Sequence, residues 1–162
     1  MNTKPAIIVF TVIAVVWWLF DRVVKIFVDS FNVNDVIVEN VIGLFNFTLI
    51  HNTGAAWGMF SDSTVPLGVF SCIVCALIVV YLFALRKGRA HVLEVIGLAL
   101  VFSGGLGNAF DRLTIGYVVD FINTTFISFP VFNIADIGVT CGIVLFLLGY
   151  FISSSHMEDE RH

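Results

Sequence analysis

The sequence predicts an all-α membrane protein with four transmembrane helices, a small extracytoplasmic β-sheet element and both termini in the cytoplasm. Three observations predict this fold class. Charged residues fill only 12% of the 162 positions, about half the share of roughly 25% that is usual in a soluble domain. Hydrophobic residues fill 59%, and the mean hydropathy is +1.00. The chain also contains four long uncharged apolar stretches, so the lipid bilayer is its expected solvent.

The four apolar stretches are Pro5–Phe20, Thr64–Leu85, Val95–Phe110 and Ile137–Ile152. A spanning helix needs about 20 apolar residues to cross a hydrocarbon core of roughly 30 Å. The second stretch has 22 residues and the others have 16 each, so those three must extend into polar flanking sequence. Because no small-residue cleavage site follows the first stretch, we expect it to be retained as a span. The expected spans of this single domain, 1–162, are about 5–25, 64–85, 92–111 and 134–152.

Basic residues indicate the direction of the spans. Arg86, Lys87 and Arg89 crowd the connection between the second and third spans, and short connections rich in Lys and Arg stay in the cytoplasm. Both termini are then expected in the cytoplasm. The loops at about 26–63 and 112–133 are expected on the outer side.

Three of the four spans carry an aspartate at the end that this topology places outside: Asp21, Asp111 and Asp136. Ionisable groups at membrane depth are costly and usually functional. Two connections on the same side resemble strands, because Phe45–Leu49 alternates apolar and polar residues and Asp120–Phe132 is rich in Phe, Ile and Thr. We expect a small sheet at the outer interface that covers a polar site.

Asp120 and Asp136 are the strongest candidates for acid–base chemistry. Neither has a lysine or arginine within seven residues, and both are flanked by apolar side chains. Burial raises the pKa of a carboxyl group, and a second carboxylate nearby raises the pKa of one member of the pair further. Two such groups brought together would share a proton and supply an acid and a base at neutral pH, as in aspartic proteases.

Other charged residues at the span ends are candidates for supporting roles. Asp21 and Lys25 are spaced i,i+4 with the acid first, which suits either an interfacial salt bridge or a direct part in catalysis. Asp111 is followed by Arg112, which we expect to be the cation within its reach.

Asn108 and Asn133 each precede an aspartate by three residues, about one turn of a helix. This placement favours a positioning role over that of ordinary polar groups at a helix end. By contrast, Asp29, Asp35 and Asp62 fall in segments that we expect to be exposed loops, so we interpret them as solvated.

Several other classes of protein are disfavoured. Eight scattered Lys and Arg residues and a net charge of −4 form no basic stripe for nucleic acid. Cys72, Cys75 and Cys141 lie in apolar runs without further ligands nearby, so neither a disulfide framework nor a zinc site is expected. The histidines are poorly placed for a metal hydrolase or for a serine peptidase built on Ser103.

A proton or ion carrier would need polar residues through the membrane depth, but the second and fourth spans carry no charge in their middles. A non-catalytic assembly factor would leave the polar clusters unexplained.

Five motifs, in order along nearly the whole chain, resemble those of the lipoprotein signal peptidases, also called signal peptidase II. Any one motif is weak, but five in order across four spans are highly specific. The sequence departs from the family's usual residues at Trp57, Ser103 and Gly105, none of which is an expected catalytic position. The motifs are Asp21-x-x-x-Lys25, Asn52-x-Gly54-Ala55-Ala56-Trp57-Gly58, Gly104 through Arg112, Val118–Phe121 and Phe132–Asp136.

The resemblance implies an aspartic endopeptidase of the bacterial cytoplasmic (inner) membrane, with its active site at the outer face. The implied substrates are prolipoproteins whose lipobox cysteine already carries diacylglycerol and which are cut just before that cysteine. Asp120 and Asp136 take the places of the catalytic dyad, and neither a metal nor a cofactor is implied. We expect a monomer in contact with membrane lipid. The other matches imply residues that bind substrate or orient the dyad (Asn52, Gly54, Asn108, Arg112 and Asn133) and residues that brace the site (Asp21, Lys25 and Asp111).

Overall fold

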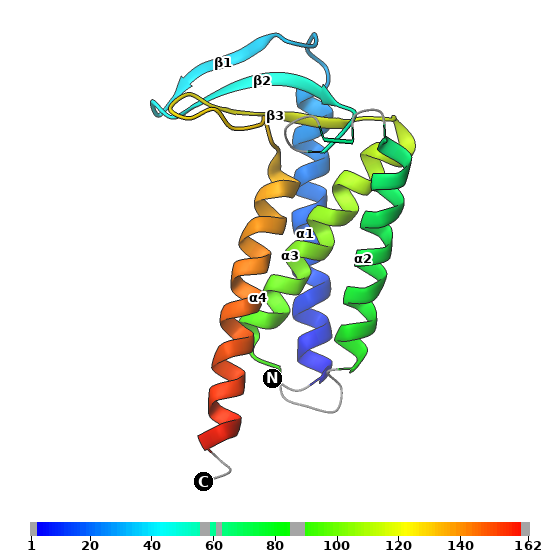
Figure 1. Ribbon diagram of the computed structural model, residues 1–162, viewed down its shortest axis with the longest axis vertical. Coiled ribbons are helices and arrows are strands. Elements are labelled where there is room, and N and C mark those ends of the chain that lie inside the picture. The colour runs from blue at the N-terminus through cyan, green and yellow to red at the C-terminus, as the bar shows by residue number, and fades with distance from the viewer. Residues whose placement is uncertain (1–2, 56–58, 61–62, 85–89, 160–162) are drawn as a thin grey trace.

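The computed structural model describes residues 3–55, 59–60, 63–84 and 90–159. Over these residues the chain forms four helices and three strands, and the strands form a sheet across one end of the helical bundle (Figure 1). Helix α1 begins and helix α4 ends at the opposite end of the bundle. The elements are α1 (Thr3–Val28), β1 (Val36–Val41), β2 (Phe45–Asn52), α2 (Thr64–Ala84), α3 (Val92–Thr114), β3 (Val118–Thr124) and α4 (Ile134–Asp159).

The four apolar helices and the small sheet confirm that part of the predicted fold. Each helix is long and apolar enough to cross a membrane. Three helices continue past the expected spans, since α1 runs to Val28, α3 to Thr114 and α4 to Asp159. In α1 and α3 the charged residues near the helix end have partners within the protein, so the helix continues where the apolar sequence stops.

Some residues used in the sequence analysis lie outside the described part of the chain. The prediction of a cytoplasmic connection depends on basic residues in this group, and one motif lies partly within it. These residues are Ala56, Trp57, Gly58, Asp62, Arg86, Lys87 and Arg89.

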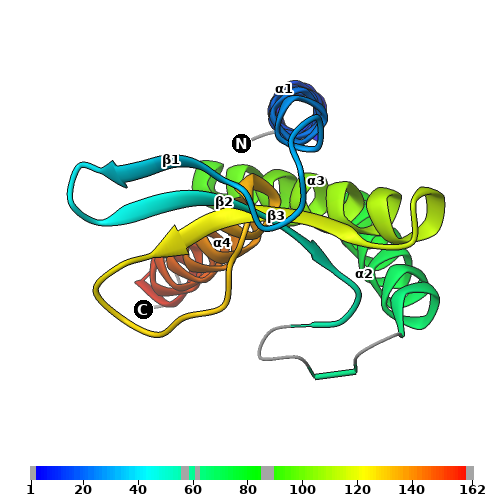
Figure 2. The ribbon, with the colours of Figure 1, turned by 90° about the horizontal axis from the view of Figure 1, so that it is seen from above.

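The sheet is antiparallel with the strand order β1-β2-β3. The prediction of a strand-like segment as far as Phe132 is wrong, because β3 ends at Thr124 and Phe132 contributes a single bridge to Ile122. Pro130, in the segment between them, lacks the N–H group that a central strand needs. Strand β1 was not predicted from the sequence, although Val36–Val38 is a β-branched run. Viewed from above, the sheet crosses the ends of α3 and α4 (Figure 2).

Helix α3 is the centre of the bundle and contacts each of the other three helices. It meets α4 backbone to backbone. A Cβ atom on Gly97 would lie 2.5 Å from the carbonyl oxygen of Gly142, and a Cβ atom on Gly104 would overlap the carbonyl oxygen of Ala135. Small residues permit this close approach between membrane helices. The part of α3 around Gly104 therefore lies against the first turn of α4, below the sheet, and the last turn of α3 lies beside α2 (Figure 1).

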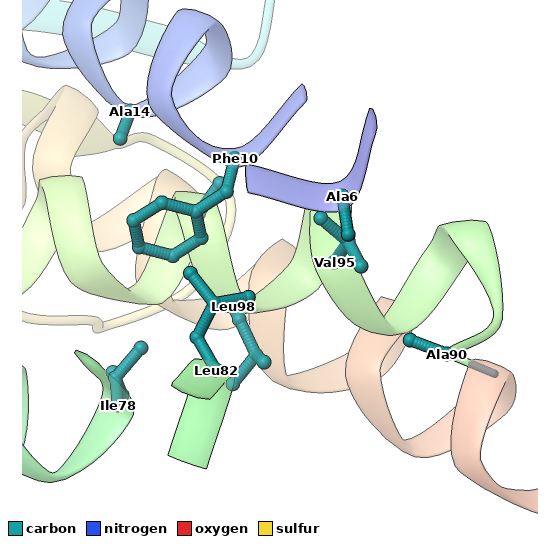
Figure 3. Packing of buried hydrophobic residues seen from close by; sticks show 9 residues of the cluster. Ala6, Phe10, Ala14, Ile78, Leu82, Ala90, Val95 and Leu98 are labelled. Atoms are coloured by element: carbon teal, nitrogen blue, oxygen red, sulfur yellow. The ribbon is translucent and has the colours of Figure 1, made fainter. Parts of the chain in front are cut away.

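Apolar side chains join α1, α2 and α3 at the end of the bundle away from the sheet. Phe10 of α1, Leu82 of α2 and Leu98 of α3 lie together in this cluster (Figure 3). The ring of Phe10 also packs on Phe102, with the ring centroids 5.4 Å apart. This packing fixes the three helices at one end, while polar side chains of α1 and α3 meet at the other.

We expect Gly97→Ala to destabilise the bundle, because the added methyl group would collide with backbone atoms of Gly142 and Phe146 in α4. Overpacking of this kind costs about 1–3 kcal/mol. Gly105→Ala is the matched control in the same helix, since its Cβ would meet the flexible side chain of Cys75 at 3.3 Å. Denaturation midpoints in detergent compare the two variants with the parent chain. Equal midpoints for both variants would contradict the backbone contact between α3 and α4.

Candidate active site

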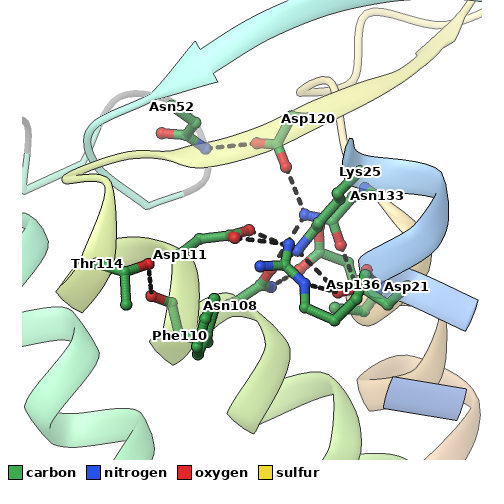
Figure 4. Close-up of polar contacts among 12 residues, drawn as sticks. Asp21, Lys25, Asn52, Asn108, Phe110, Asp111, Thr114, Asp120, Asn133 and Asp136 are labelled. Atoms are coloured by element: carbon green, nitrogen blue, oxygen red, sulfur yellow. Dashed lines mark hydrogen bonds and ion pairs between the residues drawn. The ribbon is translucent and has the colours of Figure 1, made fainter. Parts of the chain in front are cut away.

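The ammonium group of Lys25 lies at the centre of a buried polar network at the sheet end of the bundle (Figure 4). Its side chain is 1% exposed and contacts two carboxylates, Oδ2 of Asp111 at 2.8 Å and Oδ2 of Asp21 at 3.2 Å. Nζ also donates to Oδ1 of Asn108 at 2.8 Å. An ammonium group has three donors, and these three oxygens match them. A buried charge is tolerated only when it is paired in this way.

Asp111 is shared between two cations of α1. Its Oδ1 lies 2.7 Å from Nη2 of Arg22, and its Oδ2 contacts Lys25. The expectation that Arg112 would be this cation is wrong, because the ion-pair partners of Asp111 are Arg22 and Lys25. Sequence reasoning missed Arg22. A second cation within one turn of Lys25, in a spanning helix, is the signal that could have found it.

Asp21 connects α1 to the start of α4. Its Oδ1 accepts the backbone N–H of Ala135 at 3.1 Å, and the first N–H groups of a helix have no partner within the helix. Gly107 makes the approach possible, because a Cβ atom there would lie 2.7 Å from Oδ2 of Asp21. Of the two roles that the i,i+4 spacing left open, the ion pair with Lys25 is present at 3.2 Å.

The side-chain amide of Asn108 links Lys25 to Asp136. Its Oδ1 faces Lys25 and also accepts from Nδ2 of Asn133 at 3.1 Å. Its Nδ2 is therefore turned toward Asp136 and donates to Oδ1 of that residue at 2.7 Å. Because Lys25 and Asn133 hold the oxygen of the Asn108 amide, its nitrogen has a fixed direction and fixes Oδ1 of Asp136.

Asp136 and Asn133 form a reciprocal pair at the start of α4. Oδ1 of Asn133 accepts the backbone N–H of Asp136 at 3.0 Å, and Oδ2 of Asp136 accepts the backbone N–H of Asn133 at 3.1 Å. This is the geometry of a capping box, in which two side chains satisfy backbone donors of the first turn. Because the two residues are three positions apart, the first turn of α4 itself holds both side chains, independently of their contacts with other elements.

Asp120 reaches the same place from the sheet. The residue is 3% exposed and lies in β3. Its Oδ1 accepts from Nδ2 of Asn133 at 2.6 Å and its Oδ2 accepts from Nδ2 of Asn52 at 2.8 Å. Asn133 therefore contacts both carboxylates and links the side chains of Asp120 and Asp136 (Figure 4).

Burial, and after it the negative charge of Asp136, raise the pKa of Asp120 from its ordinary value of 3.8 to about 7. The hydrogen bonds from Asn52 and Asn133 and the positive charge of Lys25 act in the opposite direction but are weaker. Asp120 therefore exchanges a proton close to neutral pH, which suits a group that acts as an acid or a base.

A cavity of about 490 Å³ opens beside the two carboxylates. Arg112 closes one side of it, because its Nη2 donates to the carbonyl oxygen of Gly54 at 3.0 Å, while the N–H of Gly54 donates to Oδ1 of Asn52 at 2.9 Å. The polar end of the cavity contains amide, guanidinium and carboxyl groups, and the rest of the wall is mostly apolar. The lining residues are Asn52, Ala55, Asn108, Arg112, Val118, Asp120, Phe129, Pro130, Val131, Phe132, Asp136, Ile137, Thr140 and Cys141.

The structure brings all ten of the expected site residues into one connected region. Within the part of the chain that it describes, no group of three or more His, Cys, Asp or Glu side chains could hold a metal ion. The interpretation of Asp29 as a solvated loop residue is wrong. Its side chain is 29% exposed, contacts His51 at 2.7 Å and accepts from Tyr117. The partners are 22 and 88 residues away in the chain, so no local signal reveals them.

The fold and the site define a multi-pass membrane protein with two carboxyl groups facing one cavity at the end of its helices. Comparison with known proteins places this arrangement in a family. The family described as signal peptidase (SPase) II matches residues 13–152. The chain belongs to this family, whose members are proteases.

Relatives and solved structures agree with that assignment. The chain is 34% identical to the lipoprotein signal peptidase of Lactiplantibacillus plantarum over 141 residues, which are 87% of this chain and 93% of that one. It is 32% identical to the lipoprotein signal peptidase of Staphylococcus aureus over 164 residues, 99% of either chain. A bacterial membrane enzyme solved by the in meso method at 2.3 Å resolution superposes with a TM-score of 0.78 at 31% identity, covering 91% of this chain and 90% of that one.

Because the pKa of Asp120 in the folded protein is raised, the folded protein binds more protons than the unfolded chain between the two pKa values. Stability is then expected to fall as pH rises through this window. Asp120→Asn removes the titration. We therefore expect the variant to gain roughly 2–3 kcal/mol relative to the parent chain between about pH 5 and about pH 8.

Denaturation in mixed detergent at the two pH values measures this difference. Asp35→Asn, at an exposed carboxylate that accepts two hydrogen bonds from Asn32, controls for the loss of one negative charge. A stability difference between Asp120→Asn and the parent that does not change with pH would contradict the raised pKa.

Proposed function

We propose that this protein is an aspartyl endopeptidase that removes signal peptides from diacylglyceryl-modified bacterial prolipoproteins, cleaving just before the lipidated lipobox cysteine. The observation that carries the proposal is that Asp120 and Asp136 both contact Asn133 and both line the same cavity. The relatives named lipoprotein signal peptidases support the substrate class. The chemistry follows from the two carboxyl groups.

In the proposed mechanism the two carboxyl groups carry one proton between them. Asp120 in its protonated form donates to the oxygen of the scissile carbonyl, and the Asp136 carboxylate takes a proton from the attacking water. The new C–O bond gives a tetrahedral intermediate without a covalent link to the enzyme. When the C–N bond breaks, Asp136 gives its proton to the leaving amine. Asp120 takes a proton back from the hydroxyl group of the intermediate that it had protonated, and the C=O bond re-forms. General acid–base catalysis of this kind contributes roughly 10²–10⁴-fold to the rate.

The remaining polar residues at the cavity are proposed to hold the substrate and orient the dyad. Asn108 and Asn133 donate to the two carboxylates and fix their direction. Arg112 lines the cavity and its Nη2 donates to the carbonyl oxygen of Gly54 at the rim, so its guanidinium group is placed to contact a carbonyl oxygen of the substrate. Asn52 and Gly54 form the turn at the rim, where an extended peptide would pass. Neither a metal nor a cofactor takes part in any step.

The diacylglyceryl group is proposed to stay in the bilayer while the peptide enters the cavity. Ile137, Thr140 and Cys141 of α4 line the cavity, and the side of α4 around Cys141 is exposed, which in a membrane means contact with lipid. A lipid chain can therefore lie against α4 with the attached cysteine beside Asp136. This arrangement explains why the site lies at the end of the helices instead of in a soluble domain.

The proposed location is the bacterial cytoplasmic membrane, with the sheet and the cavity at the outer face and both termini in the cytoplasm. The basic residues Arg86, Lys87 and Arg89, which the sequence places between α2 and α3, support this direction. The complete set of site residues within one chain supports action as a monomer.

The test is cleavage by the purified protein in lipid of a diacylglyceryl-modified prolipoprotein and of the same protein without lipid. We expect cleavage of the lipidated form alone. Asp120→Asn and Asp136→Asn should each lower the rate by about 10²–10⁴-fold or more, because the acid or the base is lost. Asp35→Asn, at the exposed carboxylate, should cleave at the parent rate.

Equal cleavage of both forms would contradict the proposed substrate class. Substantial activity in either dyad variant would contradict the assignment of Asp120 and Asp136. Correct membrane insertion of each variant is checked first by its yield and its denaturation midpoint.

A further inference from the structure

Three side chains outside the cavity form a second polar cluster, where α1, β2 and β3 meet. The carboxylate of Asp29, one residue after α1, contacts Nε2 of His51 at 2.7 Å through Oδ1. Its Oδ2 accepts the hydroxyl of Tyr117 at 3.3 Å. The rings of His51 and Tyr117 stack, with their centroids 3.7 Å apart and their planes 16° from parallel. One carboxylate and two stacked rings thus link three segments of the chain.

The sheet register connects this cluster to the candidate active site. His51 and Asn52 are the last two residues of β2 that pair with β3. Successive side chains of a strand point to opposite faces, so the side chains of His51 and Asn52 lie on opposite faces of the sheet. On one face His51 and Tyr117 form a diagonal pair across the strands, and on the other face Asn52 and Asp120 do the same.

Asn52 is at the point where β2 leaves the sheet. Its backbone pairs with Val118 at the end of the ladder, and strand ends open easily unless other contacts hold them. The hydrogen bond from Nδ2 of Asn52 to Asp120, at 2.8 Å, depends on the distance between the two strands at this end. A contact that holds the end of β2 against β3 therefore also sets this hydrogen bond.

We propose that Asp29, His51 and Tyr117 form a clamp that holds the end of β2 and so positions Asn52 against Asp120, which makes them positioning residues for the cleavage reaction. This inference rests on the proposed function. Among the described residues, the charged or titratable groups that face His51 are Asp29, one residue after α1, and Tyr117, one residue before β3. Burial, and then the charge of Asp29, raise the pKa of Tyr117, so its hydroxyl stays protonated and remains a donor.

The clamp has a consequence that a purely structural contact would not have. The hydrogen bond from Asn52 lowers the pKa of Asp120 against the effect of burial. If the end of β2 is loosened, this hydrogen bond lengthens and the pKa of Asp120 rises further. The pH dependence of cleavage then moves to higher pH, whereas a variant that is only less stable keeps the parent profile.

The experiment measures kcat and KM of His51→Ala for a lipidated prolipoprotein from about pH 5 to about pH 9. We expect kcat to fall roughly tenfold while KM changes by less than about twofold, because Asp120 loses the hydrogen bond that orients it while the rest of the cavity lining is kept. The limb of the kcat profile due to Asp120 should move to higher pH. Tyr117→Phe, which keeps the stacked ring and loses the hydroxyl, should show a smaller change in the same direction and serves if His51→Ala does not fold.

A double-mutant cycle with Asn52→Ala separates the clamp from general stabilisation. If the clamp acts through Asn52, His51→Ala has little further effect on kcat once Asn52 is removed. Asp35→Asn, in the same outer segment but without contact to the cluster, is the control with parent kinetics. Additive losses in the double variant, or a parent pH profile in both His51→Ala and Tyr117→Phe, overturn the clamp.

A failure of the proposed function is distinguishable from a failure of the clamp. If the parent protein cleaves no lipidated substrate, the proposed function is wrong. The clamp is then tested without catalysis. The stability difference between the parent and Asp120→Asn changes at the pH where Asp120 titrates. The same difference, measured between His51→Ala and His51→Ala/Asp120→Asn, should change at a higher pH, and an unchanged pH overturns the clamp.

Discussion

The arrangement of the site depends on one buried ammonium group, that of Lys25. Its desolvation costs several kcal/mol and is compensated only by close, well-directed partners. Those partners come from α1 and α3, through Asp21, Asp111 and Asn108. The contact with the amide oxygen turns the amide nitrogen of Asn108 toward Asp136. The electrostatic requirement of one cation thus sets the direction of a carboxylate that it does not touch.

The two carboxyl groups come from different elements, which explains where the cavity lies. Asp136 is fixed by the first turn of α4, and Asp120 is carried by the sheet that crosses the end of the bundle. Close packing of α3 against α4 brings Asn108 into contact with Asp136 and Asn133. The space that remains is bounded by the sheet and by apolar residues of α4. A peptide attached to a membrane lipid fits the proposed use of such a space, since its lipid can stay beside the helices.

The helices and most of the site could be predicted from the sequence because a membrane restricts what a chain can do. Apolar stretches of span length must be helices, and charged residues at their ends must find partners. Which charged residues form ion pairs with one another could not be predicted from their neighbours in the sequence. Adjacent helix residues do not face each other, so Asp111 pairs with Arg22 of α1 and not with Arg112. The contacts of Asp29 depend on the sheet register, and β1 becomes a strand only by pairing with β2.

The measurement that tests the central claim most directly compares Lys25→Met with the double variant Lys25→Met/Asp111→Asn. Lys25→Met removes the donor to Asn108 and leaves Asp111 with one cation, whereas the double variant restores the balance of charge. If Lys25 acts by orienting Asn108, both variants should form folded protein and lose cleavage of a lipidated prolipoprotein by roughly 10²-fold. Near-parent cleavage in the double variant would show that Lys25 only neutralises Asp111, and would contradict this account.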